Sequence, residues 1–199
     1  MSNFVNLLKN RRSIYDLGKN TSLSNEEIVS LVTEVVRESP TAFNSQSQRV
    51  VFLFDEAHEK LWKMTEELLQ PLTPPEAFEN TKAKLSGFAK GKATILFYED
   101  MDIVKGLQEQ FSLYADNFPI WSEQASGLTQ SNVWTALAEE NIGANLQHYN
   151  PIIDDSVANE WNISDSWKLR GQLVIGSIES PALEKEYMED DTRFKQFSK

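Results

Sequence analysis

Short apolar runs set between helical patterns are the feature that most constrains the fold. Val50–Phe54 and Ala93–Phe97 are two such runs, and Gly171–Ile178 is expected to form a third strand. Apolar runs of this length are typical of strands covered on both faces. They are far shorter than the ~20 residues that a membrane-spanning helix needs. Three buried strands separated by helices predict an α+β fold.

Helical periodicity accounts for most of the remaining chain. Ser24 and Glu27 have the spacing of a capping box, and Pro40 ends the helix that follows. We expect His58 to lie on the surface at a helix start, and Gly143 to end the longest helix in the left-handed conformation. No linker or repeat interrupts the pattern, so a single domain over residues 1–199 is predicted. Further helices are predicted over residues 3–10, 58–70, 102–114, 122–141 and 155–161. A weaker helix is predicted after Pro75 and ends at about residue 88.

The composition excludes several classes of protein. The 199 residues carry a formal net charge of −11 and contain no cysteine. The absence of cysteine excludes disulfides, thiolate nucleophiles and cysteine-ligated metal or iron–sulfur sites. An acidic surface repels nucleic acids and anionic lipids, so neither nucleic acid nor membrane is an expected partner. Because the N-terminus lacks the pattern of a secretory signal, we expect a cytoplasmic protein.

The usual motifs of side-chain catalysis are also missing from the sequence. The eight glycines form neither a G-x-G-x-x-G nor a Walker-type loop, and no serine lies in G-x-S-x-G. His58 and His148 are far apart in the sequence and outside an H-E-x-x-H motif, so no metal site is predicted. A bound organic cofactor would supply the chemistry that these side chains lack.

Three polar segments indicate such a cofactor. Arg11-Arg12-Ser13 combines two guanidinium groups with a hydroxyl, and guanidinium groups form strong charge-assisted bonds to phosphate. Residues 39–49 are rich in amides and hydroxyls, which suit the edge of a heterocycle. Arg193 and Lys195 add two cations near the C-terminus. Each segment alone is also typical of a turn, a surface loop or a solvated terminus.

In this order, the three segments resemble the nitroreductase family of FMN-dependent oxidoreductases. The family's R-[RH]-S segment is matched by Arg11-Arg12-Ser13, and its P-[ST]-x-x-N-x-Q segment by residues 40–46. The basic pair after the last strand is matched by Arg193 and Lys195. Residues 143–151 resemble the branch that contains the fungal fatty-acid-repression-mutant proteins. The resemblance implies a mixed β-sheet between helices, and a homodimer with an exchanged C-terminal tail and FMN at the subunit interface.

The resemblance also implies which residues bind FMN. The first segment would hold the phosphate and the polar edge of the flavin, and the tail would add charge at the phosphate. The second segment would approach from the partner subunit, and residues 147–150 would lie beside the ring. The implied cofactor-binding residues are Arg11, Arg12, Ser13, Pro40, Thr41, Asn44, Gln46, Gln147, His148, Tyr149, Asn150, Arg193 and Lys195. No catalytic side chain is implied, because the flavin carries the chemistry.

Two segments differ from the pattern of many relatives. Ser47-Gln48 follows Gln46 where those relatives have Pro-Trp, and residues 148–151 replace a Pro-Ile-acid-Gly segment. The implied activity is hydride transfer from NAD(P)H through FMN to a small electron-poor aromatic acceptor, nitroaromatic or quinone-like. One alternative is a flavin-binding regulatory or sequestering protein of the same fold with little turnover. Another is an interaction protein without a cofactor, in which Arg11 and Arg12 pair with acidic tail residues such as Asp190 and Asp191.

Overall fold

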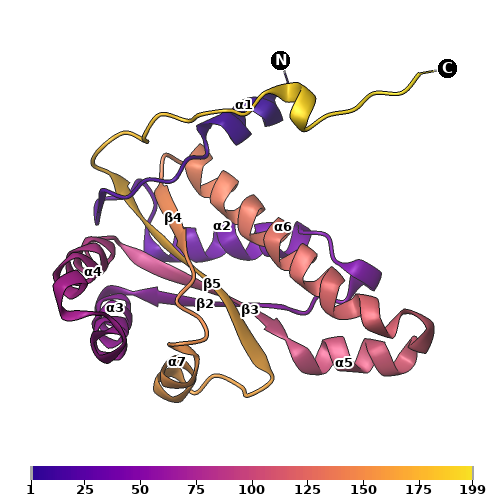
Figure 1. The fold of residues 1–199 in the computed structure, drawn as a ribbon, viewed down its shortest axis with the longest axis horizontal. Coiled ribbons are helices and arrows are strands. Elements are labelled where there is room, and N and C mark those ends of the chain that lie inside the picture. The colour runs from indigo at the N-terminus through magenta and orange to yellow at the C-terminus, as the bar shows by residue number, and fades with distance from the viewer. Residues whose placement is uncertain (1, 199) are drawn as a thin grey trace.

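A computed structural model describes residues 2–198 and contains a five-stranded β-sheet with helices on both faces (Figure 1). The strands are β1 (Leu17–Gly18), β2 (Gln48–Phe54), β3 (Ala93–Asp100), β4 (Gly143–Gln147) and β5 (Trp167–Ile178). Their order is β1-β5-β3-β2, and β4 also pairs with β5. These ladders are antiparallel, and Ser13 forms an isolated parallel bridge with Ala144. The α+β class is confirmed, and the mixed character of the sheet rests on that bridge.

The helices occupy the regions expected from periodicity. The α-helices are α1 (Asn3–Asn10), α2 (Asn25–Glu38), α3 (Asp55–Leu69), α4 (Pro75–Ala89), α5 (Met101–Gln110), α6 (Phe118–Glu139) and α7 (Asp154–Trp161). Short 3-10 turns are η1 (Ala42–Asn44), η2 (Gln70–Leu72), η3 (Ser112–Asn117) and η4 (Asp190–Thr192). Among residues 2–198, no helix has both the length and the apolar character needed to cross a membrane. The single-domain boundary and the cytoplasmic location stay predictions.

Alternate residues of β3 contribute to two separate cores. Ile95 and Phe97 pack with side chains of α2 and α6, whereas Leu96 and Tyr98 pack with side chains of α3, α4 and α7. All four side chains are buried. Because successive side chains of a strand point to opposite faces, this central strand stabilises both helix layers.

Three expectations from the sequence are wrong in detail. β2 was expected to be covered on both faces, but it is an edge strand of the sheet. Most of its side chains are only half-buried, because an edge strand has a neighbouring strand on one side alone. His58 was expected on the surface, but it is fully buried. Its ring Nδ1 lies 2.8 Å from the Thr94 hydroxyl inside the core. Asn141, with a φ of 57°, adopts the left-handed conformation instead of Gly143. Gly143 begins β4, where a Cβ would lie only 2.8 Å from Leu17 Cδ2.

Candidate functional site

The Arg11-Arg12-Ser13 segment leaves α1 and runs beside β4. Ser13 forms the parallel bridge with Ala144, and the Ile14 N–H donates to the Ala144 carbonyl at 2.9 Å. The buried Asn145 side chain donates from Nδ2 to the Ile14 carbonyl at 2.8 Å. Contacts from β4 therefore position the segment that carries the two arginines.

The two guanidinium groups of this segment are partly buried. Arg11 lies over the Trp134 ring, 4.4 Å from its centroid, and Arg12 donates to the Leu183 carbonyl. Burial, together with the neighbouring Arg12 charge, lowers the pKa of Arg11. Within residues 2–198 neither guanidinium forms an ion pair with a carboxylate, so pairing with the acidic tail is not observed. The described protein leaves two adjacent positive charges without an anionic partner.

Trp134 adds a hydrogen-bond donor next to these charges. Its indole Nε1 is buried and has no hydrogen-bond partner among the described residues 2–198. A buried donor without a partner costs about 1–3 kcal/mol. Two adjacent guanidinium groups without a carboxylate partner suit a phosphorylated ligand, and the Trp134 ring under Arg11 carries a further unsatisfied N–H. The residues present therefore fit the phosphate end of FMN.

Residues 147–150 follow at the other end of β4. The buried Gln172 of β5 accepts a hydrogen bond from the Tyr149 N–H at 2.7 Å and donates to Asn150 Oδ1 at 3.2 Å. Tyr149 and Asn150 are half-buried, whereas His148 is exposed. In the part of the chain that the structure describes, no group of three acidic or histidine side chains could hold a metal ion.

Buried amides connect the two ends of β4, and sequence reasoning missed two of them. Gln147 donates from Nε2 to Asn145 Oδ1 at 2.9 Å, and Asn145 in turn holds the Ile14 carbonyl. Asn145 and Gln172 were not among the expected site residues. The available signal was an amide within an otherwise apolar strand, because a buried amide needs partners and therefore positions its neighbours.

Along β4, the arginine pair and residues 147–150 lie at opposite ends. The bridge from Ser13 to Ala144 is parallel, so Arg11 and Arg12 lie before the bridge and Gln147 three residues beyond it. At about 3.3 Å per strand residue, Gln147 is roughly 10 Å from the bridge. The arrangement suits an elongated ligand with an anionic end and a heterocyclic end.

The loop over residues 40–46 has an unusual backbone. Phe43, Asn44 and Gln46 have φ angles of 56°, 52° and 48°, in the left-handed region that favours glycine. Each such residue costs about 1–3 kcal/mol unless surrounding contacts hold it. The Gln46 N–H donates to Thr41 Oγ1 at 3.2 Å, while Pro40, Asn44 and Gln46 remain exposed. A strained, exposed polar loop is a frequent feature of ligand sites.

A hollow of about 400 Å³ lies between this loop and the first half of α6. Its wall includes Pro40–Phe43, Trp121 and Leu128. The Phe43 ring stacks on the Trp121 ring with centroids 6.0 Å apart and an angle of 18° between the planes. The hollow offers apolar and aromatic surface to a planar group.

Within one protomer, the loop and the arginine pair meet different parts of α6. The loop faces Trp121–Leu128, whereas Arg11 contacts Trp134. With a rise of 1.5 Å per helical residue, Trp134 is about 9 Å from Leu128 and about 20 Å from Trp121 along the axis. The structure therefore does not bring these two expected parts of the site together in one protomer.

The tail residues Arg193 and Lys195 are exposed. Arg193 lies 5.4 Å from the centroid of the Phe194 ring, and among residues 2–198 no ion pair or hydrogen bond joins either cation to the arginine pair. The contact between the tail and the arginine pair is made by Leu183 with Arg12. Figure 1 shows the C-terminal end projecting away from the sheet.

Comparison with known proteins gives a consistent result. The nitroreductase family matches residues 8–177 of the chain. A Saccharomyces cerevisiae protein named as nitroreductase HBN1 is 32% identical over 193 residues, with 96% of each chain covered.

Solved structures are similar over nearly the whole chain. Nitroreductase CinD from Lactococcus lactis, in complex with chloramphenicol, is 55% identical with a TM-score of 0.91, covering 98% of this chain and 100% of its own. CinD has also been solved with nicotinic acid and with 4-nitrophenol. A nitroreductase with bound FMN from Desulfitobacterium hafniense is 12% identical and shares the fold, with a TM-score of 0.72 and complete coverage of both chains.

Proposed function

The chain belongs to the nitroreductase family, and on that premise we propose that it is an FMN-dependent oxidoreductase that uses NAD(P)H to reduce nitroaromatic or quinone-like acceptors. Membership of the family supports the flavin oxidoreductase class. The similarity to CinD, which was solved with chloramphenicol and with 4-nitrophenol, supports a small aromatic acceptor.

The observation that carries this proposal is the partly buried arginine pair, which no carboxylate of residues 2–198 neutralises. Arg11, Arg12 and Ser13 hold the phosphate and polar edge of FMN, and Gln147, His148, Tyr149 and Asn150 lie beside its ring. Bound FMN supplies the redox chemistry, which is consistent with the absence of a side-chain catalytic motif. The protein positions the cofactor and places donors where negative charge develops.

In the same proposal, a second copy of the chain completes the site. The loop residues Pro40, Thr41, Asn44 and Gln46 and the tail cations Arg193 and Lys195 come from that copy. Their separation from the arginine pair within one protomer supports this arrangement. The apolar side chains of α1 support it too, since Phe4 is 59% and Leu8 40% exposed in the single chain. Exposed apolar side chains gathered on one helix are typical of an interface.

The first test is an absorption spectrum of the purified protein, followed by reconstitution with FMN. We expect a flavin spectrum and steady oxidation of NADPH or NADH when a nitroaromatic acceptor is added. A colourless protein that takes up no FMN would contradict the proposal. Flavin binding with negligible turnover would instead indicate the sequestering role.

Replacing Arg11 or Arg12 with alanine tests the phosphate contact. A charge-assisted bond contributes about 1.5–3 kcal/mol, so each substitution should weaken FMN binding by roughly 10- to 100-fold. Titration of the apoprotein with FMN, followed by flavin fluorescence, measures this change. Arg37→Ala is the matched control, because Arg37 is an exposed arginine in the last turn of α2. Equal FMN affinity in all three variants would exclude the arginine pair from the site.

A further inference from the structure

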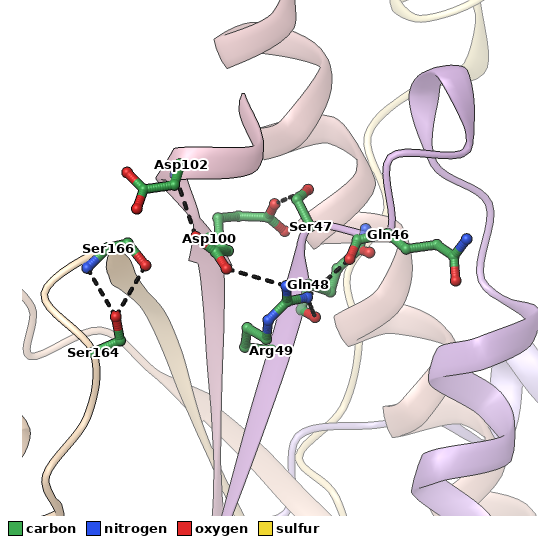
Figure 2. A network of polar contacts seen from close by, with 9 residues as sticks. Gln46, Ser47, Gln48, Arg49, Asp100, Asp102, Ser164 and Ser166 are labelled. Atoms are coloured by element: carbon green, nitrogen blue, oxygen red, sulfur yellow. Dashed lines mark hydrogen bonds and ion pairs between the residues drawn. The ribbon is translucent and has the colours of Figure 1, made fainter. Parts of the chain in front are cut away.

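A buried carboxyl lies directly behind the strained loop. Glu99, near the end of β3, has no exposed surface, and neither has Ser47. The Ser47 hydroxyl donates to Glu99 Oε2 at 2.6 Å, whereas Glu99 Oε1 has no hydrogen-bond partner among residues 2–198. Figure 2 shows Ser47 beside Gln46, with Arg49 directed toward Asp100. Neither residue was among the site residues expected from the sequence.

Ser47 anchors the loop through its backbone as well as its side chain. It directly follows Gln46, which has a φ of 48°, and its carbonyl accepts a hydrogen bond from the Asp100 N–H at 2.9 Å. Arg49 donates to the Gln46 carbonyl at 2.9 Å and to Asp100 Oδ2 at 3.1 Å. Two consecutive residues of β3 therefore hold the end of the loop, Glu99 through Ser47 and Asp100 through Arg49.

The first part of the loop is held by the Phe43 ring, which packs against Phe111 and Trp121, whereas the part after Phe43 has fewer contacts outside the loop. Asn44 and Gln46 are exposed, and the Gln46 amide bond to Thr41 Oγ1 lies within the loop itself. Left-handed conformations at non-glycine residues persist only where surrounding structure holds them. Ser47 and Glu99, in contrast, are both fully buried at the end of the loop.

The charged groups around Glu99 come from β2, β3, β5 and α6. Arg49 of β2 pairs with Asp100, and Arg170 of β5 pairs with Glu123 of α6, so both cations already have partners. Burial raises the pKa of Glu99 to about 7, and Glu123 adds to this effect, whereas Ser47, Arg170 and Arg49 oppose it. A carboxyl with this pKa ionises more readily when the loop opens and water reaches it.

We propose that Glu99 and Ser47 are positioning residues whose hydrogen bond holds loop residues 41–46 in the conformation that contacts FMN. The consequence for FMN rests on the proposed function, whereas the anchoring of the loop concerns the apoprotein alone. Opening of the loop exposes Glu99, so the closed loop is favoured at low pH. The preference for the closed loop declines as the pH rises from 4.5, the ordinary pKa of a glutamate, to about 7, the pKa of buried Glu99. Above about pH 7 the preference no longer changes with pH.

Hydrogen exchange of the apoprotein tests the anchor. The readout is the protection factor of the Gln46 amide, corrected for the intrinsic exchange rate, and the Lys92 amide is the internal reference because it donates to the Ile175 carbonyl elsewhere in the sheet. Relative to Lys92, we expect Gln46 protection to fall at least about tenfold between pH 5 and 7, since one pKa unit corresponds to tenfold. Glu99→Gln should abolish this pH dependence.

Variants separate this role from a general loss of structure. Ser47→Ala should lower Gln46 protection at every pH, and Ser47→Thr, which keeps the hydroxyl, should restore it. Glu76→Gln is the matched control, since it removes an exposed carboxyl at the start of α4 that does not contribute to the pKa shift of Glu99, and it should retain the pH dependence of the wild type. An unchanged pH profile in Glu99→Gln, or wild-type protection in Ser47→Ala, would overturn the proposal.

FMN titration provides the second readout. We expect Ser47→Ala to bind FMN at least about fivefold more weakly than the wild type, with Ser47→Thr close to the wild type. Equal affinity in Ser47→Ala and the wild type would show that the anchor does not serve the flavin. If the wild type itself binds no FMN, the proposed function fails, while the exchange experiment still decides whether Glu99 anchors the loop.

Discussion

The buried His58 ring should make the stability of the protein depend on pH in the acidic range. The Thr94 hydroxyl accepts the Trp62 indole N–H at 3.0 Å and lies 2.8 Å from His58 Nδ1, to which it can donate its own proton. The contact suits a neutral imidazole whose Nδ1 accepts, while the buried Nε2 has no hydrogen-bond partner among residues 2–198. Burial lowers the pKa of His58 to about 4. Because this value lies below the 6.5 of an ordinary histidine, the folded state favours the uncharged ring.

The stability contribution of His58 should therefore be complete above about pH 6.5 and decline as the pH falls toward 4, by about 3 kcal/mol in total. We expect the difference in free energy of unfolding between the wild type and His58→Asn to shrink by about 1–3 kcal/mol between pH 7 and 4.5. Urea unfolding, followed by tryptophan fluorescence, measures the free energy of unfolding of both proteins at each pH. A difference that is independent of pH would show that another group governs acid unfolding.

For individual residues, sequence motifs and structure gave different information. The motifs selected Arg11, Arg12 and Ser13, and the structure places them together beside β4, although their role in binding FMN stays a prediction. Asn145 and Glu99 escaped notice because a polar residue within a strand does not reveal whether it is buried. Their burial depends on the layer packed above them, which is a tertiary property.

The start of α2 provides a test at the level of one element. The Glu27 N–H donates to Ser24 Oγ at 3.2 Å and the Ser24 N–H to Glu27 Oε2 at 2.8 Å, which confirms the predicted capping box. Ser24→Ala should lower the free energy of unfolding by about 1 kcal/mol, or Tm by about 2–4 °C. Ser30→Ala, an exposed change within the same helix, is the control and should have almost no effect. Equal melting temperatures for the two variants would contradict a stabilising cap.

Elements with strong local signals were predicted most accurately. The expected bounds of α1 are those observed, and α2 ends before Pro40 as expected. In contrast, the helix expected over residues 102–114 ends at Gln110 and continues as the η3 turn. There Phe111 packs 5.0 Å from Phe43 of the strained loop, ring centroid to ring centroid. This contact joins the end of the helix to a segment far away in the sequence, which no local pattern reveals.

At the level of the whole molecule, the tail after β5 is the segment least explained by a single protomer. Leu183 is 75% and Phe197 90% exposed. In the proposed homodimer, removal of residues 181–199 should weaken dimerisation by about 100-fold or more, because two such side chains contribute about 3 kcal/mol when buried. Sedimentation velocity over a range of protein concentrations measures this change.

A second tail variant separates dimer formation from cofactor binding. Arg193→Ala combined with Lys195→Ala leaves the apolar tail residues in place, so the dimer should persist while FMN binding weakens. If the truncated chain and the full chain have the same oligomeric state, the tail does not form the subunit interface.

Local sequence patterns were enough to predict where most helices and strands form and to identify the polar segments of the nitroreductase pattern. Caps, apolar stripes and short apolar runs act over a few residues, so they can be recognised without knowledge of the partners. Tertiary structure alone decided that β2 is an edge strand, that His58 and Glu99 are buried, and that the loop after Pro40 adopts left-handed backbone angles. Each of these outcomes depends on contacts between residues distant in the chain, whose burial and hydrogen bonds outweigh local preference.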